Sequence, residues 1–464
     1  MDLTGPVLRV TAARPRVLTA PLPGSTAVRL AAEREVRRRG WATASTPADA
    51  DLLLVLGTPV SALTAAVDRL ARDIPAPRAT VRVATPREVA AALDTGRSLL
   101  TDPTLQRRTV RAAGPGGEED DGGHGDGGDD DGGDDGHGGE EEHGAPENDD
   151  HGGHEGHGGH GGHGGHGGHG GHGGHGGHGG HGGHGGHGGH GGHGGDMDMP
   201  GGLPMADQAE DRDGLTLDRL HFSLGPLLGD WPTALTVRLA VQGDVIQEAE
   251  VDPTSWADAD RPPGGVFWNE PWERAEAGGR VTTGQAARRR AACRLDSVAR
   301  LLAVAGWPAQ AVRARRLRDA LLAGAAASEV APGAARLARR VGRSRVLYWL
   351  THGIAPLSRA DARAAGVYGP AADADGDVPA RYRAWLAAVE EDVARLDDGA
   401  PLDPRAFPPP RGPAVAGRPP SAGLVRVLPG LLRGAELAAA RLTVASLDPD
   451  VDELIGLGPE VTDG

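Results

Sequence analysis

The sequence contains no lysine and a single cysteine, Cys293, in 464 residues. All 48 basic residues are therefore arginines. Without lysine the chain cannot form the phosphate-binding loop G-x-x-x-x-G-K-[ST], which excludes the nickel-inserting GTPases. A single cysteine excludes an internal disulfide and any zinc or iron–sulfur site with four cysteine ligands.

Long apolar segments are also scarce. The longest charge-free apolar run, residues 52–67, is short and is broken by Gly57 and Pro59, so we expect no membrane span. The first residues have neither the basic nor the apolar region of a secretory signal. We therefore expect a cytoplasmic protein, with a peripheral position at the inner face of the membrane as the alternative.

The negative charge is concentrated in one segment. Residues 118–155 carry 17 Asp and Glu and no basic residue, whereas the net charge of the whole chain is −16, so all other residues sum to about +1. Residues 114–202 consist mainly of Gly, Asp, Glu and His without hydrophobic periodicity. Such a composition cannot offset the entropy cost of ordering, so we expect a disordered linker over this range.

This linker also contains a tract of fifteen histidines at a spacing of three, nearly all in Gly-Gly-His units. The candidate metal ligands are His151, His154, His157, His160, His163, His166, His169, His172, His175, His178, His181, His184, His187, His190 and His193. Neutral imidazole suits nickel, zinc and copper, and Gly-Gly links fold back easily enough to bring rings together. The tract predicts reversible binding of nickel or zinc, which suits buffering or storage. The alternative is a neutral spacer that grew by repetition.

An α/β domain is expected before the linker, over residues 1–113. Apolar runs at residues 16–20, 51–56 and 80–84 alternate with helical patterns that start after Ser25, at Val60 and at Pro86. Uninterrupted apolar strands separated by helices are typical of a parallel sheet covered on both faces. The sequence therefore predicts a three-layer α/β domain with a parallel sheet, in which Ser25 caps the first helix.

An α-rich α+β domain is expected after the linker, over residues 203–464. Apolar and polar side chains alternate over residues 235–241, and residues 245–251 follow a Gly-Asp turn, which predicts an antiparallel hairpin. Apolar residues recur at helical spacing over residues 291–305, and Pro308 begins the next predicted helix.

Residues 39–84 contain an ordered series of motifs. A serine-proline approach leads to Ala-Asp and to an apolar strand that ends in Gly57-Thr58, and a helix then leads to Pro75-Ala-Pro77 and the next strand. This order resembles the small iron–sulfur (20 kDa-type) subunit of NADH:quinone oxidoreductase, known as complex I. The resemblance covers about half of the N-terminal domain.

Two further motifs lie near the two ends of the C-terminal domain. His221-Phe-Ser-Leu-Gly-Pro226, with the hairpin that follows it, is similar to the opening of the 49 kDa-type subunit of the same complex, which is related to the large subunit of nickel–iron hydrogenases. Ala445-Ser-Leu-Asp-Pro-Asp450 is similar to the terminal Ser-x-Asp-Pro signature of that family. The resemblances together imply a small and a large subunit fused through the His-rich linker.

The chain departs from both families at their cofactor positions. The small subunit holds its cluster through cysteines after its strands, but residues 20–27 and 84–88 contain none. The Cys-x-x-Cys of hydrogenases is missing, Asp450 stands where its last cysteine would be, and the quinone-contacting histidines of the 49 kDa opening motif are absent. We therefore expect no iron–sulfur cluster and a scaffold that has lost its electron carriers.

Residues 288–345 carry fourteen arginines against three acidic residues, Asp296, Asp319 and Glu329. This pattern fits a helical surface that docks an acidic partner subunit or the chain's own acidic linker, or simply a solvated face. We expect no nucleic-acid binding, because no basic and aromatic interleaving accompanies the arginines.

No residue outside the tract is assigned a catalytic or cofactor-binding role. His221 and His352 are interpreted as structural, and Cys293 as a buried apolar residue rather than a nucleophile. Asp51 and Thr58 flank the central strand, where α/β folds often bind ligands, but no glycine-rich fingerprint accompanies them.

Three functions are compatible with these features. The first is a non-catalytic accessory, assembly or peripheral subunit of a complex I-like or energy-converting hydrogenase-like oxidoreductase, with membrane-bound subunits as partners and a linker that buffers metal. The second is a nickel or zinc storage or chaperone protein. The third is an oxidoreductase subunit that relies on the cofactors of its partners.

Overall fold

The computed structural model describes residues 12–112, 207–210, 216–261 and 264–457. The expected linker and its histidines lie outside these ranges, so the expectations for them remain predictions. Residues 1–118 and 204–464 belong to one compact unit, so the two halves of the chain pack together. Among the described residues, no helix is long and apolar enough to cross a membrane.

The N-terminal half contains a parallel sheet of three strands in the order β1-β2-β3. These are β1 (Val17–Pro21), β2 (Leu52–Leu56) and β3 (Ala79–Val83), and each lies close to its expected position. The connecting helices are α2 (Thr26–Arg38) and α3 (Ser61–Asp73), and α4 (Val89–Thr101) and α5 (Pro103–Ala112) follow β3. All five residues of β2 are buried, which explains its uninterrupted apolar sequence.

A short backbone bridge extends this sheet beyond β1. Thr43 pairs with Val17 in parallel, and Val17 donates its N–H to the carbonyl of Ala42 at 2.9 Å. The order in space is therefore residue 43, β1, β2, β3, and the chain changes its direction of winding between β1 and β2. In open α/β sheets, the carboxyl ends of two such strands form the usual ligand-binding position, here called the switch point.

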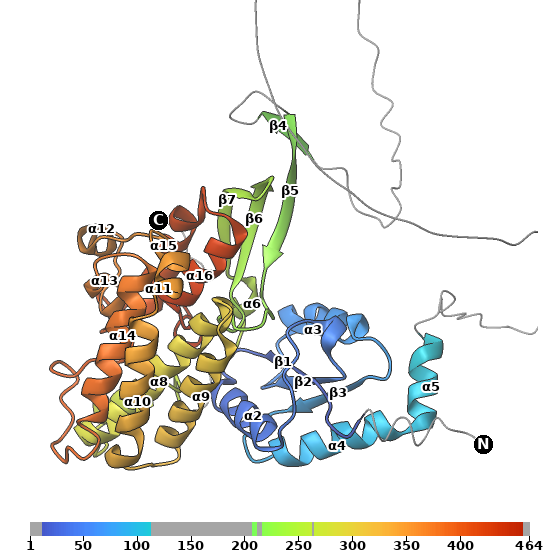
Figure 1. The fold of residues 1–464 in the computed structure, drawn as a ribbon, viewed down its shortest axis with the longest axis horizontal. Coiled ribbons are helices and arrows are strands. Elements are labelled where there is room, and N and C mark those ends of the chain that lie inside the picture. The colour runs from blue at the N-terminus through green and yellow to red at the C-terminus, as the bar shows by residue number, and fades with distance from the viewer. Residues whose placement is uncertain (1–11, 113–206, 211–215, 262–263, 458–464) are drawn as a thin grey trace, which may run out of the picture. The chain divides into compact units, whose positions relative to one another are not determined.

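Helices cover both faces of the sheet (Figure 1). On one face, apolar side chains of α2 and α4 pack on Val17, Leu52 and Leu54. On the other face, Leu63 and Val67 of α3 join Leu18 and Leu53 in a core that continues into the C-terminal half. The arrangement is that of helices on both sides of a parallel sheet, as the sequence predicts.

The C-terminal half begins with an antiparallel sheet of four strands in the order β4-β5-β6-β7. They are β4 (Asp207–Glu210), β5 (Thr216–Leu224), β6 (Thr236–Gln242) and β7 (Val245–Asp252), and the β6-β7 pair is the predicted hairpin. The His221 motif was not predicted to be a strand, although apolar and polar residues alternate over residues 220–224 as in a strand. In the structure residues 220–223 are all exposed.

The remainder of the C-terminal half is helical, as expected. The helices are α6 (Thr254–Ala257), α7 (Glu270–Glu276), α8 (Thr283–Val304), α9 (Pro308–Leu322), α10 (Ala327–Gly342), α11 (Arg345–Thr351), α12 (Arg359–Ala364), α13 (Pro370–Asp373), α14 (Val378–Val393), α15 (Pro420–Leu432) and α16 (Leu437–Leu447). A capping box starts α8, because Thr282 Oγ1 accepts the N–H of Gln285 while the Gln285 side chain accepts the N–H of Thr282. Every residue from 290 to 299 in α8 is buried, so this helix lies at the centre of the C-terminal half.

Helix α2 connects the two halves. Val28 and Val36 face the sheet, whereas Leu30 belongs to the apolar core around α8 and α9. Helix α2 therefore lies between the sheet and the C-terminal helices, next to α9 in Figure 1. Its remaining inward side chains are charged, and they begin the candidate site.

Candidate functional site

The switch point is filled by a carboxylate from the C-terminal end of the chain. Asp452 lies in the 3-10 helix η2 (Val451–Glu453). Its Oδ1 accepts the N–H of Gly24 at 2.7 Å, and its Oδ2 accepts the hydroxyl of Thr26 at 3.1 Å. Asp452 is 4% exposed. The N-terminus of α2, which favours anions, thus binds a carboxylate of the same chain.

Ser25 does not cap α2, contrary to the sequence prediction. Its side chain makes no capping hydrogen bond, and its buried Oγ has no partner among the described residues. A helix cap normally has an extended backbone, whereas Ser25 has φ −91° and ψ 10°. Gly57 packs closely against it, because a Cβ at Gly57, with φ +106°, would lie 2.7 Å from the Ser25 Cβ.

The environment of Asp452 favours its protonated form. Burial and the neighbouring Asp450 raise the pKa of Asp452 to about 7, against the hydrogen bonds from Gly24 and Thr26. Burial also raises the pKa of Glu453, although its carboxylate accepts bonds from Asn269 Nδ2 at 3.0 Å and from the N–H of Ser421 at 3.1 Å. Asp452 at the switch point and the neighbouring Glu453 are therefore both poorly solvated acidic side chains.

A second set of charges lies where α2 meets α8 and α9. Asp296 of α8 is 1% exposed and accepts hydrogen bonds from Arg29 Nη2, at 2.7 Å, and from Arg318 Nη1. Arg300 is 3.6 Å from the same carboxylate. Burial alone would raise the pKa of Asp296, but Arg29, Arg318 and Arg300 hold it well below its usual range.

Glu33 extends this set along α2. It accepts hydrogen bonds from Arg29 at 2.7 Å and from Arg318 at 2.9 Å. Arg318 is completely buried and also bonds Asp319 at 2.8 Å. Burial would raise the pKa of Glu33, but the surrounding arginines lower it. We call Arg29, Glu33, Asp296, Arg318 and Asp319 the interface network, since it joins the two halves of the chain.

Asp448 and Asp450 of the terminal Ser-x-Asp-Pro motif continue the line of charges. Arg300 forms an ion pair with Asp448, which links this motif to Asp296. Arg411 donates from Nη2 to Asp448 at 2.8 Å and from Nη1 to Asp450 at 3.2 Å. Asp450, which stands where a metal-binding cysteine would be expected, thus forms an ion pair with Arg411.

Cys293 lies beside this arginine. Its thiol is buried, 3.6 Å from Arg411 Nη1, and burial raises its pKa to about 12. The adjacent cavity, lined in part by Ser297 and Asp448, measures only about 20 Å³. A cavity of this size holds about one water molecule. The prediction that Cys293 is buried is confirmed.

A further buried carboxylate lies on α14. Asp392 is completely buried and accepts hydrogen bonds from Arg290 Nη2, at 2.6 Å, and from Arg294. The guanidinium of Arg290 lies 3.4 Å from the ring centre of Phe407. These arginines belong to the basic segment 288–345, and they are internal.

The residues present do not fit the cofactors of the resembled families. Among the described residues, no group of three or more His, Cys, Asp or Glu side chains could hold a metal ion. The carboxylates nearest Cys293 pair with Arg411, a cation that competes with a metal for the same oxygens. Cys293 alone cannot hold an iron–sulfur cluster. The fifteen histidines from His151 to His193 lie outside the described residues.

The other sequence candidates are not brought together. His221 is exposed on β5, and His352 is a surface residue whose Nδ1 lies 3.1 Å from Asp377 Oδ2. Asp51 accepts the N–H of Arg16 at 2.7 Å, and Thr58 is exposed. None of these side chains contributes to the interface network.

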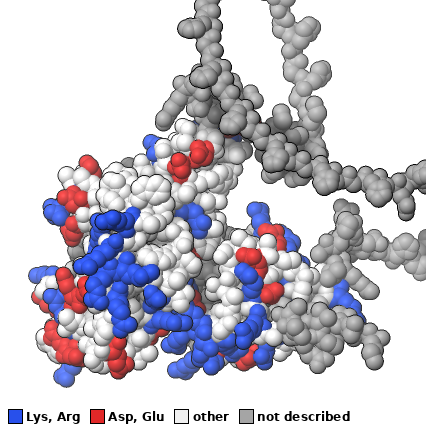
Figure 2. Space-filling view, in the orientation of Figure 1, with Lys and Arg blue, Asp and Glu red and all other residues white. Residues whose placement is uncertain are grey.

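The basic segment 288–345 separates into two groups of arginines. The arginines of α8, with Arg315 and Arg318 of α9, turn inward to carboxylates or carbonyls, so the expectation of one basic surface is wrong for them. The exposed group is Arg313, Arg316, Arg336, Arg339, Arg340, Arg343 and Arg345. Figure 2 shows arginine side chains gathered over α9 and α10. The arginines of α8 are internal because this helix lies at the centre of the C-terminal half.

Sequence reasoning missed the interface network and Asp452. Arg29, Glu33 and Arg37 recur at a spacing of four on α2, which is also the pattern of a solvated helix face. Asp452 lies two residues beyond a recognised motif but has no signal of its own. Only the packing of the two halves shows that these charges are internal.

Comparison with known proteins finds likenesses among solved structures. No family model and no curated protein matches the chain. One chain of the membrane-bound sulfane sulfur reductase, an archaeal respiratory membrane complex, aligns with 51% of this chain and 98% of that chain, at 16% identity and a TM-score of 0.38. The protein is thus similar over half of its length to a chain of a respiratory membrane complex, and this degree of likeness carries no information about activity.

Proposed function

We propose that the protein is a non-catalytic accessory, assembly or peripheral subunit of a complex I-like or energy-converting hydrogenase-like membrane oxidoreductase. The observation that carries the proposal is the carboxylate of Asp452 at the switch point, where it takes the N–H of Gly24 and the hydroxyl of Thr26. The small-subunit-like half is therefore closed by its own chain at the position where this fold offers a ligand site.

The contact between the two halves supports a structural role. Arg29 and Glu33 of α2 pair with Arg318 and Asp296 of the C-terminal helices. Such paired charges favour one arrangement of the halves, because a shift that removed one partner while the other stayed buried would leave an uncompensated charge, which is costly. The fused subunits would thus form one rigid module with no room at this contact for a quinone or a cluster.

Exposed apolar side chains support a subunit with partners. Leu220 and Phe222 are exposed on β5, and α11 presents Val346 at 69% and Trp349 at 79% exposure. Large apolar side chains at a surface mark contacts with other proteins when they cluster, and Trp and Arg dominate such contacts energetically. A peripheral position against membrane-bound subunits would cover them.

The proposal is tested by purifying the tagged full chain from the membranes of its own organism. We expect it to copurify in a fixed ratio with membrane subunits of an oxidoreductase, both before and after deletion of residues 114–202. Isolation without such subunits would contradict an accessory role. Visible absorption of an iron–sulfur cluster in the isolated chain would favour the third function, an oxidoreductase.

The histidine tract supports a second proposal, the buffering or storage of nickel or zinc through His151 to His193. Imidazole binds these metals only when it is neutral, and the pKa of histidine is about 6.5. The affinity of the tract for metal should therefore fall steeply below about pH 6. Calorimetric titration with nickel compares the full chain with the chain lacking residues 114–202. Several ions per full chain and none for the deletion are expected, and identical isotherms would refute metal binding by the tract.

A further inference from the structure

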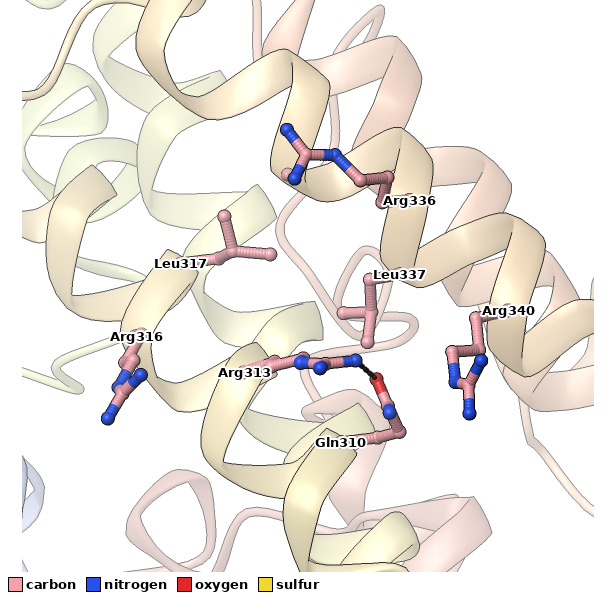
Figure 3. Close-up of a pocket in the computed structure, with 8 residues that line it drawn as sticks. Gln310, Arg313, Arg316, Leu317, Arg336, Leu337 and Arg340 are labelled. Carbon is pink, nitrogen blue, oxygen red and sulfur yellow. Dashed lines mark hydrogen bonds between the residues drawn. The ribbon is translucent and has the colours of Figure 1, made fainter.

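A pocket of about 550 Å³ lies between α9 and α10, outside the site described above. Each helix contributes one stripe of side chains at helical spacing, and Figure 3 shows how they face each other. The lining residues are Gln310, Arg313, Arg316 and Leu317 from α9, and Gly333, Arg336, Leu337 and Arg340 from α10. A volume of this size is in the range of pockets for small organic molecules.

The inner surface of the pocket is apolar. Leu317 and Leu337 point into the space between the helices (Figure 3), and Leu337 is only 3% exposed. Gly333 lets the helices approach, because a Cβ there would lie 2.7 Å from Leu317 Cδ2. The pocket is therefore closed at Gly333 by the contact of the two helices and has leucine side chains as its floor.

The polar rim is positively charged without compensation. Arg313 donates to Gln310 Oε1 at 3.1 Å, Arg336 donates to the carbonyl of Pro332 at 3.2 Å, and Arg340 lies over the Trp307 ring at 5.9 Å. Within the described part of the chain, none of the four pocket arginines has a carboxylate in ion-pair distance. Arg315 and Arg318, on the same helix α9, are by contrast both paired with carboxylates.

We propose that this pocket binds a phosphate-bearing organic molecule. Guanidinium groups present pairs of N–H donors that match phosphate oxygens, so Arg313, Arg336 and Arg340 at the rim are the proposed phosphate ligands. The leucine floor then takes the apolar part of the same molecule. Water-soluble phosphate esters and the headgroups of anionic phospholipids share this chemistry. The proposal does not depend on the protein being an oxidoreductase subunit.

The test measures binding of three probes to the full chain: inorganic pyrophosphate, a nucleoside monophosphate, and vesicles of phosphatidylglycerol. The double substitution R336Q/R340Q removes two pocket arginines. The matched control R339Q/R343Q removes the same charge at two exposed arginines outside the pocket, one in the last turn of α10 and one at its C-cap. Circular dichroism establishes that both variants fold.

We expect saturable binding of at least one probe, weakened about tenfold or more by R336Q/R340Q and much less by R339Q/R343Q. Binding of the soluble probes identifies a free phosphate compound as the ligand, and binding of the vesicles alone identifies a lipid headgroup. Equal weakening by both double substitutions would show a diffuse effect of surface charge and would overturn the proposal. So would the absence of saturable binding by all three probes.

Discussion

Replacement of Asp296 by asparagine tests how much the interface network contributes to the free energy of unfolding. The substitution D296N keeps the shape of the side chain and removes its charge. Arg318, which is completely buried, and Arg29 then face a neutral amide, and Arg300 loses the carboxylate at 3.6 Å. The NH2 group of the asparagine amide is a donor, so it faces guanidinium donors that the carboxylate oxygen had accepted.

The expected loss is large because these charges are out of water. Removing one partner of a buried ion pair costs about 3–5 kcal/mol, a large part of the 5–15 kcal/mol that stabilises a typical domain. Asp94 provides the control. It pairs with Arg39 at 2.7 Å, but its side chain is 58% exposed, so D94N should cost at most about 1 kcal/mol.

Urea unfolding followed by tryptophan fluorescence and circular dichroism measures both losses. Seven of the eight tryptophans lie in the C-terminal half, so fluorescence reports mainly on that half, whereas circular dichroism reports on the helices of both halves. D296N should shift both reports together, because the network joins the halves. If D296N and D94N cost the same within about 0.5 kcal/mol, the network does not hold the halves together and the reasoning is refuted.

Three further predictions concern single side chains. The pKa of Asp452, about 7, lies above its ordinary value of 3.8, so the folded state binds more protons than the unfolded state between about pH 4 and 7. The free energy of unfolding should therefore contain a component that falls as pH rises through this window, and D452N should abolish that component; unchanged pH dependence in D452N would contradict the assignment. The thiol of Cys293, buried and with its pKa raised to about 12, should react with iodoacetamide at pH 8 only after unfolding, and rapid alkylation of the folded protein would disprove its burial. W349A should leave the free energy of unfolding within about 0.5 kcal/mol of the parent, because Trp349 is 79% exposed, and a larger loss in urea unfolding would mean that α11 is held inside the fold.

The elements of the fold were predictable where one physical pattern dominates. In three cases the buried apolar residues follow the spacing that is typical of their element. These are the apolar run of β2, the hairpin of β6 and β7, and the apolar stripe of α8. β5 was missed, although apolar and polar residues alternate over residues 220–224 as they do in a strand. Ser25 was wrongly predicted as a cap, because backbone conformation and the contact with Gly57 outweigh its local preference.

The candidate site was predictable only in its outline. Motifs near Gly57 and Asp450 indicated the two families, and the lack of cysteines after β1 and β3 indicated the loss of their cofactors. The places of Asp452 and of the arginine–carboxylate network were not predictable, because a charged residue at helical spacing has the same sequence pattern on a solvated face and at an internal contact. Tertiary packing decides between them.

The central claim is that the protein is a subunit of a membrane oxidoreductase to which it contributes no electron carrier. The most direct measurement compares the iron–sulfur electron paramagnetic resonance spectrum of the complex purified with this chain and from a strain without it. We predict the same cluster signals per complex from the two strains, with less complex assembled in the strain without the chain. Loss of one cluster signal together with the chain would contradict the claim.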